Sequence, residues 1–163
     1  MASAFDAIDW EHWTPVDVCT LVFVIDGPRI LLIRKKRGLG AGKVNGPGGR
    51  QDPGETIEEC GVREIHEEVG LRVSALQLAG VLRFQFADGY STHVHVYRTD
   101  QYEGEPIETD EAIPFWVATD AIPYGEMWED DRFWIPMMLR GVRFEGRFLF
   151  DDDRLIDYVL THG

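Results

Sequence analysis

Basic residues are scarce in this chain of 163 residues. Only 16 lysines and arginines stand against 29 aspartates and glutamates, which leaves a formal net charge of −13. A surface of that sign disfavours long nucleic acid, which binds to basic patches and releases counterions there. A small phosphorylated ligand remains compatible with it, because divalent cations can bridge carboxylates to phosphate oxygens.

Long apolar runs and cysteines are also few. The longest apolar run, around residues 21–25, is strand-sized and far below the ~20 residues that a membrane-spanning helix needs. The first fifteen residues carry three acids and no basic stretch, so no secretory signal is predicted. Cys19 and Cys60 are therefore expected to be reduced thiols in a cytoplasmic protein that has no membrane partner.

The pattern of apolar residues predicts one α+β domain, with a mixed β-sheet sandwiched between α-helices. Hydrophobic residues make up 44% of the chain, which is ordinary for a globular protein with a single core. Residues 1–15 are predicted to be an N-terminal extension and residues 16–163 the domain. Predicted strands outnumber predicted helices. They are residues 16–25, 29–34, 76–86, 93–98 and 113–117, with further apolar segments at 143–150 and 155–160.

A glycine-rich segment precedes the first predicted helix. Residues 36–54 hold seven glycines and two prolines, and we expect a functional loop with no regular element. Thr56 and Glu59 have the spacing of a capping box, which predicts that a helix starts there. Gly70 is placed to end that helix as its C-terminal stop.

Two adjacent aspartates precede a second predicted helix, which runs to about residue 140. Asp is a preferred N-cap residue, so capping is the simplest interpretation of Asp130 and Asp131 when they are considered alone. The predicted apolar positions of this helix are Phe133, Met137 and Leu139.

Three glutamates share one face of the first helix. Glu64, Glu67 and Glu68 are spaced i, i+3, i+4, and such like charges destabilise an isolated helix. A solvated acidic face is one explanation. The other is a metal site, because bunched carboxylates suit Mg²⁺ or Mn²⁺, hard cations that take further ligands from substrate phosphates. Arg63 is expected to pair with Glu55 or a neighbouring glutamate and hold the carboxylates in place.

The whole segment from Gly49 to Leu71 fits the pattern G-x5-E-x7-R-E-U-x-E-E-x-G-U, where U is a bulky apolar residue. At roughly 6% usage per residue type, such a match arises by chance on the order of 10⁻⁸ to 10⁻⁹ times per starting point. On this motif the chain resembles the Nudix hydrolases. The fixed residues are Gly49, Glu55, Arg63, Glu64, Glu67, Glu68 and Gly70.

Outside this motif the chain is similar to the MutT-like branch of that family, and within it to the mammalian oxidised-purine nucleoside triphosphate diphosphatases. The similar stretches are residues 35–49, 108–117, 127–139 and 148–160. The resemblance implies a Mg²⁺-dependent hydrolysis of 8-oxo-dGTP and related nucleotides to the monophosphate and pyrophosphate, in nucleotide-pool sanitation. It implies as metal ligands the carbonyl of Gly48 and the carboxylates of Glu64, Glu67, Glu68 and Glu111. One of these glutamates would act as the base, with Arg63 completing the catalytic set.

The same resemblance implies where the purine binds. The base would stack on Trp128, and its Watson–Crick edge would be read by Asn45, Asp130 and Asp131. Two adjoining carboxyl groups do not easily both ionise, so one can keep a proton and donate it. Three more positions match residues that line the nucleotide site, although ordinary strand packing would explain them too. They are Thr20, Lys35 and Phe84.

Some positions depart from the family pattern. Leu39, Val44 and Pro47 replace aromatic residues, which thins the expected wall near the base. His93 and His95 share one strand face and resemble a metal pair, but without a third ligand we interpret them as structural.

Two other functions remain open at this stage. One keeps the metal site and changes the substrate to ADP-ribose, a dinucleoside polyphosphate, a nucleotide sugar or capped RNA. The other is a non-catalytic nucleotide sensor, a class that usually loses the motif glutamates. The expected partner is a small nucleotide, and the protein is expected to be a monomer or a homodimer.

Overall fold

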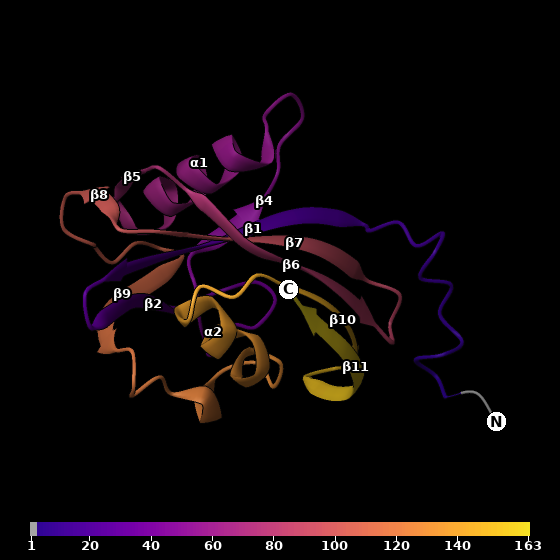
Figure 1. Cartoon of the computed structure of the whole chain (residues 1–163). Coiled ribbons are helices and arrows are strands. Elements are labelled where there is room, and N and C mark those ends of the chain that lie inside the picture. The colour runs from indigo at the N-terminus through magenta and orange to yellow at the C-terminus, as the bar shows by residue number, and fades with distance from the viewer. Residues whose placement is uncertain (1–2) are drawn as a thin grey trace.

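The computed structural model describes residues 3–163, which form eleven strands and two α-helices, with α1 after the fourth strand and α2 before the last two (Figure 1). The strands are β1 (Asp17–Asp26), β2 (Arg29–Lys35), β3 (Val44–Asn45), β4 (Gly48–Arg50), β5 (Arg72–Ser74), β6 (Gln77–Phe86), β7 (Ser91–Thr99), β8 (Gln101–Glu103), β9 (Ala112–Ala118), β10 (Phe144–Asp151) and β11 (Arg154–His162). The helices are α1 (Ile57–Val69), α2 (Asp131–Leu139) and a short 3-10 turn, η1 (Tyr124–Glu126).

Nine strands form one mixed sheet in the order β11-β10-β6-β7-β1-β2-β3, with β4 pairing β1 and β9 pairing β2. The β1–β7 and β10–β6 pairs are parallel, while β6–β7 and β10–β11 are antiparallel. The predicted α+β class and mixed sheet are confirmed. β5 and β8 form a separate two-stranded sheet that the sequence pattern did not reveal.

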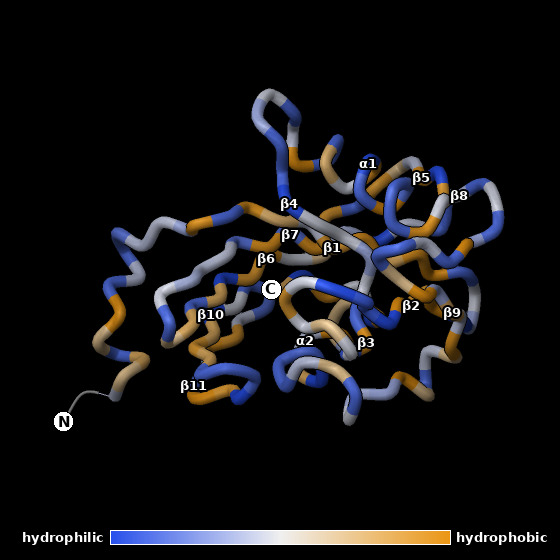
Figure 2. The backbone as a smooth tube through the Cα atoms, turned by 180° about the vertical axis from the view of Figure 1, so that it is seen from behind, coloured by the Kyte–Doolittle hydropathy of each residue, from blue (hydrophilic) through white to orange (hydrophobic). Residues whose placement is uncertain are grey.

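Alternating side chains divide the core into two layers. On β1, Phe23 faces one layer together with Trp134 of α2, whereas Val22 and Val24 face the other together with Ile65 of α1. Helix α1 therefore covers one face of the sheet and α2 covers the other (Figure 1). The tube view shows hydrophobic stretches within strands such as β2 and β9 (Figure 2), as expected where both faces of a sheet are covered. The sheet is thus sandwiched between helices, as predicted.

Helix α1 begins and ends where the sequence predicts. The hydroxyl of Thr56 accepts from the amide of Glu59, and the Glu59 carboxylate accepts from the amide of Thr56. Gly70 ends the helix in the left-handed region, at φ 79°, which glycine reaches without a steric penalty. Because both ends of α1 are fixed by these caps, the helix face that carries Glu64, Glu67 and Glu68 has a defined position beside β4.

Two predictions about the middle and the end of the chain are wrong. Residues 36–54 do contain regular structure, because β3 and β4 pair with β2 and β1 through main-chain groups, which glycine supplies as well as any residue. In α2 the buried positions are Trp134, Ile135 and Met138, whereas Phe133 lies on the surface against Tyr158. Met137 and Leu139 are only partly buried at the edge of the core, so the predicted phase was off by one position.

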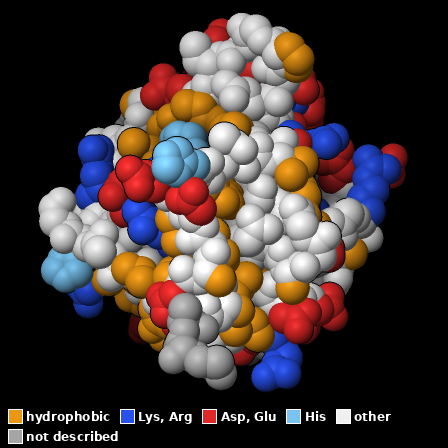
Figure 3. Space-filling view, turned by 90° about the vertical axis from the view of Figure 1, so that its right-hand side faces the viewer, with side chains coloured by type: hydrophobic (Ala, Val, Ile, Leu, Met, Phe, Trp, Pro, Cys, Tyr) orange, Lys and Arg blue, Asp and Glu red, His pale blue; other side chains and the backbone are white. Residues whose placement is uncertain are grey.

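The predicted N-terminal extension, residues 1–15, packs on the sheet from residue 3 onward, while residues 1 and 2 lie outside the described range. Trp13 donates from Nε1 to Oε1 of Gln85 at 3.0 Å, and Trp10 lies 5.9 Å from the guanidinium of Arg147. Figure 3 looks onto this side of the molecule and shows apolar patches between charged groups. The segment covers the part of the α1 face that α1 leaves open.

His93 and His95 lie under this segment, with ring centroids 4.6 Å apart. Burial, followed by the neighbouring His95, lowers the pKa of His93 to about 4, so the ring is neutral at physiological pH. Within residues 3–163 no third side chain joins them in a group that could hold a metal ion. None of the described helices is long and apolar enough to cross a membrane.

Candidate active site

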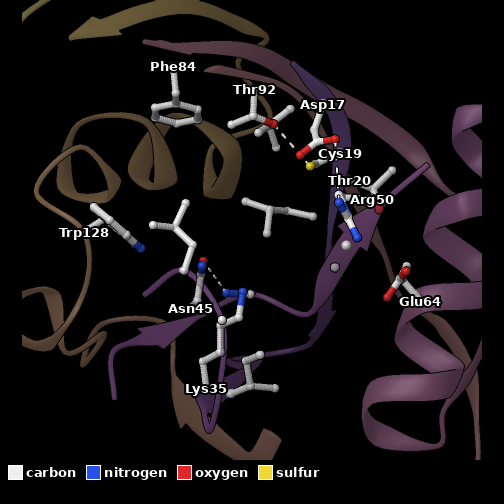
Figure 4. Close-up of a pocket in the computed structure, with 18 of the residues that line it drawn as sticks. Asp17, Cys19, Thr20, Lys35, Asn45, Arg50, Glu64, Phe84, Thr92 and Trp128 are labelled. Carbon is white, nitrogen blue, oxygen red and sulfur yellow. Dashed lines mark hydrogen bonds and ion pairs between the residues drawn. The ribbon is translucent and has the colours of Figure 1, made fainter. Parts of the chain in front are cut away.

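A cavity of about 640 Å³ opens beside β1, between the glutamates of α1 and the start of α2. It collects eleven of the thirteen residues that the sequence singled out. These are Thr20, Lys35, Asn45, Gly48, Glu64, Glu68, Phe84, Glu111, Trp128, Asp130 and Asp131. Figure 4 shows the two ends of the cavity, with Phe84 and Trp128 at one end and Glu64 on α1 at the other. The remaining two residues, Arg63 and Glu67, lie behind the acidic end.

Carboxylates define the acidic end. Glu68 is only 4% exposed, and its Oε1 accepts from the amide of Gly48 at 3.1 Å. Burial raises the pKa of Glu68 to about 7, and burial also raises the pKa of Glu64. Glu111 enters the same space from the loop before β9 and raises both pKa values further. Carboxyl groups held close in a partly desolvated site favour a bound cation.

Arg63 ties these carboxylates to the loop. It bonds Glu55 twice, from Nε to Oε2 at 3.0 Å and from Nη2 to Oε1 at 2.6 Å. Its Nη1 also donates to Glu64 at 2.9 Å and to Glu67 at 3.1 Å. The predicted pairing of Arg63 is confirmed, both with Glu55 and with the neighbouring glutamates Glu64 and Glu67. The hydrogen bonds from Arg63 hold the pKa of Glu55 at about 2.

The donor set suits a hard divalent cation, although the carboxylates do not converge as they stand. In the described part of the chain, no three His, Cys, Asp or Glu side chains form a group that could hold a metal ion. Glu67, 51% exposed at its side chain, is turned toward Arg63. Glu64, Glu68 and Glu111 instead share the cavity, and their oxygens are the ligands that Mg²⁺ and Mn²⁺ prefer. The buried Glu68, with its raised pKa, is the group that a cation would stabilise most.

Two glycines allow this end to pack closely. A Cβ on Gly49 would collide with the carboxyl group of Glu64, and a Cβ on Gly48 would collide with the carbonyl of Thr20. Glycine at both positions therefore lets β4 lie between β1 and the glutamates of α1. This is a physical reason for glycine at the start of the sequence motif.

Aromatic rings form the opposite end. Trp128 stands edge-on to Phe86 and Phe150, with ring centroids 5.9 and 5.4 Å away, and this contact fixes the plane of the indole. Phe84 lines the same end and stacks on Phe148 at 5.3 Å. Such rings offer a flat apolar platform for a planar ligand.

Asp130 and Asp131 lie beside this platform and are 2% and 3% exposed. Asp130 accepts at Oδ2 from Nε1 of Trp134 at 2.7 Å and makes no capping bond to the described helix, so the N-cap interpretation of its side chain is wrong. The buried carboxyl groups of Asp130 and Asp131 lie close enough to influence each other's pKa. Burial raises the pKa of Asp130 to about 6 and that of Asp131 well above its usual range, which leaves at least one proton on the pair. The Oδ2 atom of Asp131 is buried without a partner among residues 3–163.

The side chains of Thr20 on β1 and Asn45 on β3 are oriented differently relative to the cavity. The hydroxyl of Thr20 points toward α1, 3.6 Å from the thiol of Cys60, so Thr20 does not present it to the aromatic end. Asn45 accepts at Oδ1 from the amide of Gly46 at 2.8 Å, which leaves its NH₂ group for a ligand. Of the three departures from the family pattern, Leu39 lines the cavity, whereas Val44 and Pro47 are buried in the interior.

Sequence reasoning missed several lining residues on β1 and beside it. They are Asp17, Cys19, Arg50, Tyr90 and Thr92. The two-residue alternation of a strand was the available signal, because neighbours of Thr20 must point to the opposite face. The sequence alone did not indicate which face of β1 would border the cavity.

The chain is similar to known proteins in both sequence and fold. A model of the NUDIX domain matches residues 14–138. The chain is 48% identical over 144 residues to the oxidized purine nucleoside triphosphate hydrolase of Danio rerio, covering 88% of this chain and 90% of that protein. It is 42% identical over 143 residues to the protein of that name in Mus musculus, covering 86% and 92%. The solved MutT protein from Bacillus halodurans superposes with a TM-score of 0.79 at 26% identity, covering 89% and 97%.

Proposed function

The chain belongs to the NUDIX family and is a Nudix hydrolase, and on this premise we propose that it hydrolyses oxidised purine nucleoside triphosphates, such as 8-oxo-dGTP, to the monophosphate and pyrophosphate. The observation that carries the substrate class is the buried pair Asp130 and Asp131 beside Trp128. The relatives that cover most of this chain carry the same activity in their names. All motif glutamates are present, which favours an enzyme over a nucleotide sensor.

Recognition of the base rests on complementary hydrogen bonds at the aromatic end. The ionised member of the aspartate pair accepts from N–H groups of the purine, and the protonated member donates to a ring nitrogen or an oxygen. Exchange of the proton between them lets one site accept both 8-oxoguanine and 2-oxoadenine. The NH₂ group of Asn45 supplies a further donor. Stacking on Trp128 contributes about 1–3 kcal/mol.

The phosphate groups bind at the acidic end. Nudix hydrolases typically require a divalent metal, usually Mg²⁺. We assign its binding to the carbonyl of Gly48 and the carboxylates of Glu64, Glu67, Glu68 and Glu111. When bound, such a cation neutralises phosphate charge and lowers the pKa of a coordinated water.

The protein supplies the proton acceptor and the alignment. One of the motif glutamates, or Glu111, takes the proton of the attacking water, a role that a carboxylate within reach of that water can fill. Arg63 holds Glu64 and Glu67 against Glu55, and Lys35 brings a positive charge into the cavity for the phosphates. No covalent intermediate is needed, since water itself is the nucleophile.

The cellular role that follows is sanitation of the nucleotide pool. Both cysteines of the described chain are free thiols, which suits a reducing compartment such as the cytoplasm. We assign residues 16–163 to the catalytic domain and residues 1–15 to an N-terminal extension, of which residues 3–15 are described and pack on the sheet.

The direct test measures nucleoside monophosphate formed from 8-oxo-dGTP, dGTP and ADP-ribose side by side in Mg²⁺, because the triphosphates also release pyrophosphate whereas ADP-ribose yields AMP and ribose 5-phosphate. We expect the highest kcat/KM with 8-oxo-dGTP, and equal or faster cleavage of ADP-ribose would overturn the proposal. Glu68→Gln is the matched control for catalysis. It should retain nucleotide binding and lose most turnover, and unchanged turnover would contradict an enzymatic role of the motif.

A further inference from the structure

Polar side chains line the cavity between its aromatic and acidic ends, and the reaction described above gives them no role. Asp17 and Cys19 come from the start of β1, Thr92 comes from β7, and Tyr90 precedes that strand. Figure 4 shows Thr92, Cys19 and Asp17 between Phe84 at the aromatic end and Glu64 at the acidic end. The parallel pairing of β1 with β7 sets Asp17 opposite Thr92, so one stretch of sheet supplies the group.

The carboxylate of Asp17 is held in place but only partly satisfied. Its Oδ2 accepts from the hydroxyl of Tyr90 at 2.8 Å, and its Oδ1 lies 3.9 Å from Nη1 of Arg50. Its side chain is 23% exposed. Because each carboxylate oxygen can accept two hydrogen bonds, Asp17 retains acceptor capacity toward the cavity.

The neighbouring side chains of Thr92 and Cys19 have less hydrogen-bonding capacity left for a ligand than Asp17 has. The hydroxyl of Thr92 donates to the sulfur of Cys19 at 3.2 Å, which commits its proton. Burial is the main reason why the pKa of Cys19 is raised, so this side chain stays a neutral thiol. Asp17 is therefore the strong, fixed acceptor of the group.

The order of the groups in a nucleotide determines which of them faces the carboxylate of Asp17. With the purine at Trp128 and the phosphates at Glu64, the sugar occupies the middle of the cavity. A carboxylate repels phosphate oxygens, but it binds hydroxyl groups of a sugar well, as acidic residues do in dinucleotide sites. We propose that Asp17 accepts a hydrogen bond from a sugar hydroxyl of the bound nucleotide and so favours nucleotides that carry this hydroxyl. Tyr90 positions the carboxylate of Asp17. This inference rests on the function proposed above.

The test pairs a protein substitution with removal of the sugar hydroxyls. kcat/KM is measured for wild type, Asp17→Ala and the exposed control Asp120→Ala with 8-oxo-dGTP, 8-oxo-GTP and 8-oxo-2′,3′-dideoxy-GTP. Losing one hydrogen bond to a charged group should lower kcat/KM of Asp17→Ala about tenfold on both hydroxyl-bearing nucleotides, mainly through KM. The dideoxy nucleotide should be cleaved equally by all three proteins.

The outcomes separate this inference from the proposed function. An equal loss on all three nucleotides would mean that Asp17 acts only through the fold, and no loss would mean that it does not contact the sugar. Either result overturns the inference and leaves the proposed function intact. If wild type cleaves none of the nucleotides, the proposed function itself fails.

Two further variants keep the test independent of folding. Asp17→Asn preserves the shape and one acceptor oxygen, so its loss should be smaller than that of Asp17→Ala and confined to the same two nucleotides. Tyr90→Phe should raise KM for these nucleotides with kcat unchanged, because it frees the carboxylate without removing it. A Tyr90→Phe protein that lost kcat on the dideoxy nucleotide as well would contradict a positioning role.

Discussion

The indole Nε1 of Trp134 donates a 2.7 Å hydrogen bond to Oδ2 of Asp130, one turn earlier at the start of α2. Both residues are buried, so the bond forms away from competing water. It fixes the orientation of the carboxyl group that would otherwise cap the helix. The aspartate pair is thereby held beside Trp128 by the core, and its geometry does not depend on a flexible loop.

Replacing Trp134 with Phe should disturb both stability and base recognition. The ring remains, but the buried carboxyl group of Asp130 loses its donor, which costs about 1–3 kcal/mol. Urea unfolding checks the stability, and kcat/KM for 8-oxo-dGTP relative to dGTP checks recognition. Trp116→Phe, on β9 outside the cavity, serves as the control. A Trp134→Phe protein of wild-type stability and selectivity would contradict this role.

The aspartate pair should also make stability depend on pH. The pKa values of Asp130 and Asp131 are raised on folding, so the folded state holds their protons more tightly than the unfolded chain. Their contribution is therefore most favourable below about pH 4. It falls as pH rises through about 6, by roughly 1–3 kcal/mol.

Asp131→Asn isolates this effect, because the amide is neutral at every pH. We expect the decline in the free energy of unfolding between pH 4.5 and 8 to become shallower, as measured by urea titration at each pH. The exposed Asp120→Asn should follow the wild-type curve. An Asp131→Asn curve that parallels wild type would show that the pair is not the source of the slope.

Arg63→Lys should reduce catalysis although the charge is kept. A single ammonium group cannot reproduce the paired bonds to Glu55 while also reaching Glu64 and Glu67. Loss of such supporting contacts typically costs 10–100-fold in activity or metal affinity. Mg²⁺ titrations of kcat provide the measurement, with Arg72→Lys on β5 as the control. Equal kcat at every Mg²⁺ concentration would rule out the positioning role.

The two glycines of β4 should respond differently to alanine. At Gly49 the new methyl group meets the end of the Glu64 side chain, which can move, so folding should survive while turnover falls about 100-fold from misplacement of the carboxylate. At Gly48 the methyl group meets the main chain of β1, which cannot move, so Gly48→Ala should be destabilised or fail to fold. Thermal unfolding and kcat of the two variants distinguish them. Similar behaviour of both would contradict this packing argument.

Mg²⁺ should stabilise the fold as well as support turnover. The partly desolvated carboxylates of Glu64 and Glu68 repel each other, and a cation that binds only the folded state raises its stability by mass action. Removal of divalent metal with EDTA should abolish pyrophosphate release, and added MgCl₂ should restore it. MgCl₂ should also raise the midpoint of thermal unfolding of the wild-type protein. The corresponding rise for Glu68→Gln should be much smaller. An equal rise in both proteins would place the cation elsewhere.

The acidic half of the site was accessible from the sequence because its determinants are local. The cap at Thr56, the glutamate spacing on one helical face and the stop at Gly70 lie within one short segment. Helical geometry converts such spacing directly into a shared face. The same holds for the Arg63–Glu55 pair, because Glu55 lies just before the helix and Arg63 lies within it.

The aromatic half depended on resemblance, because its members come from distant segments. Asn45 on β3, Phe84 on β6 and Trp128 before α2 meet only through the order of the sheet. Strand order and register are set by non-local pairing, which no short-range pattern encodes. The alternation of β1 was visible, but the sequence did not tell which face would border the cavity, so Thr20 was named and Asp17 was missed.

The sequence by itself determined the family, the α+β class and the acidic end of the site, because a continuous motif and helical periodicity carry that information over short distances. Only the tertiary structure decided that the side chain of Asp130 binds Trp134 instead of capping α2. It also decided that the hydroxyl of Thr20 faces α1 and that Asp17 lies between the aromatic and acidic ends of the cavity. These features depend on which face of each element is buried and against what, and burial is a property of the assembled layers.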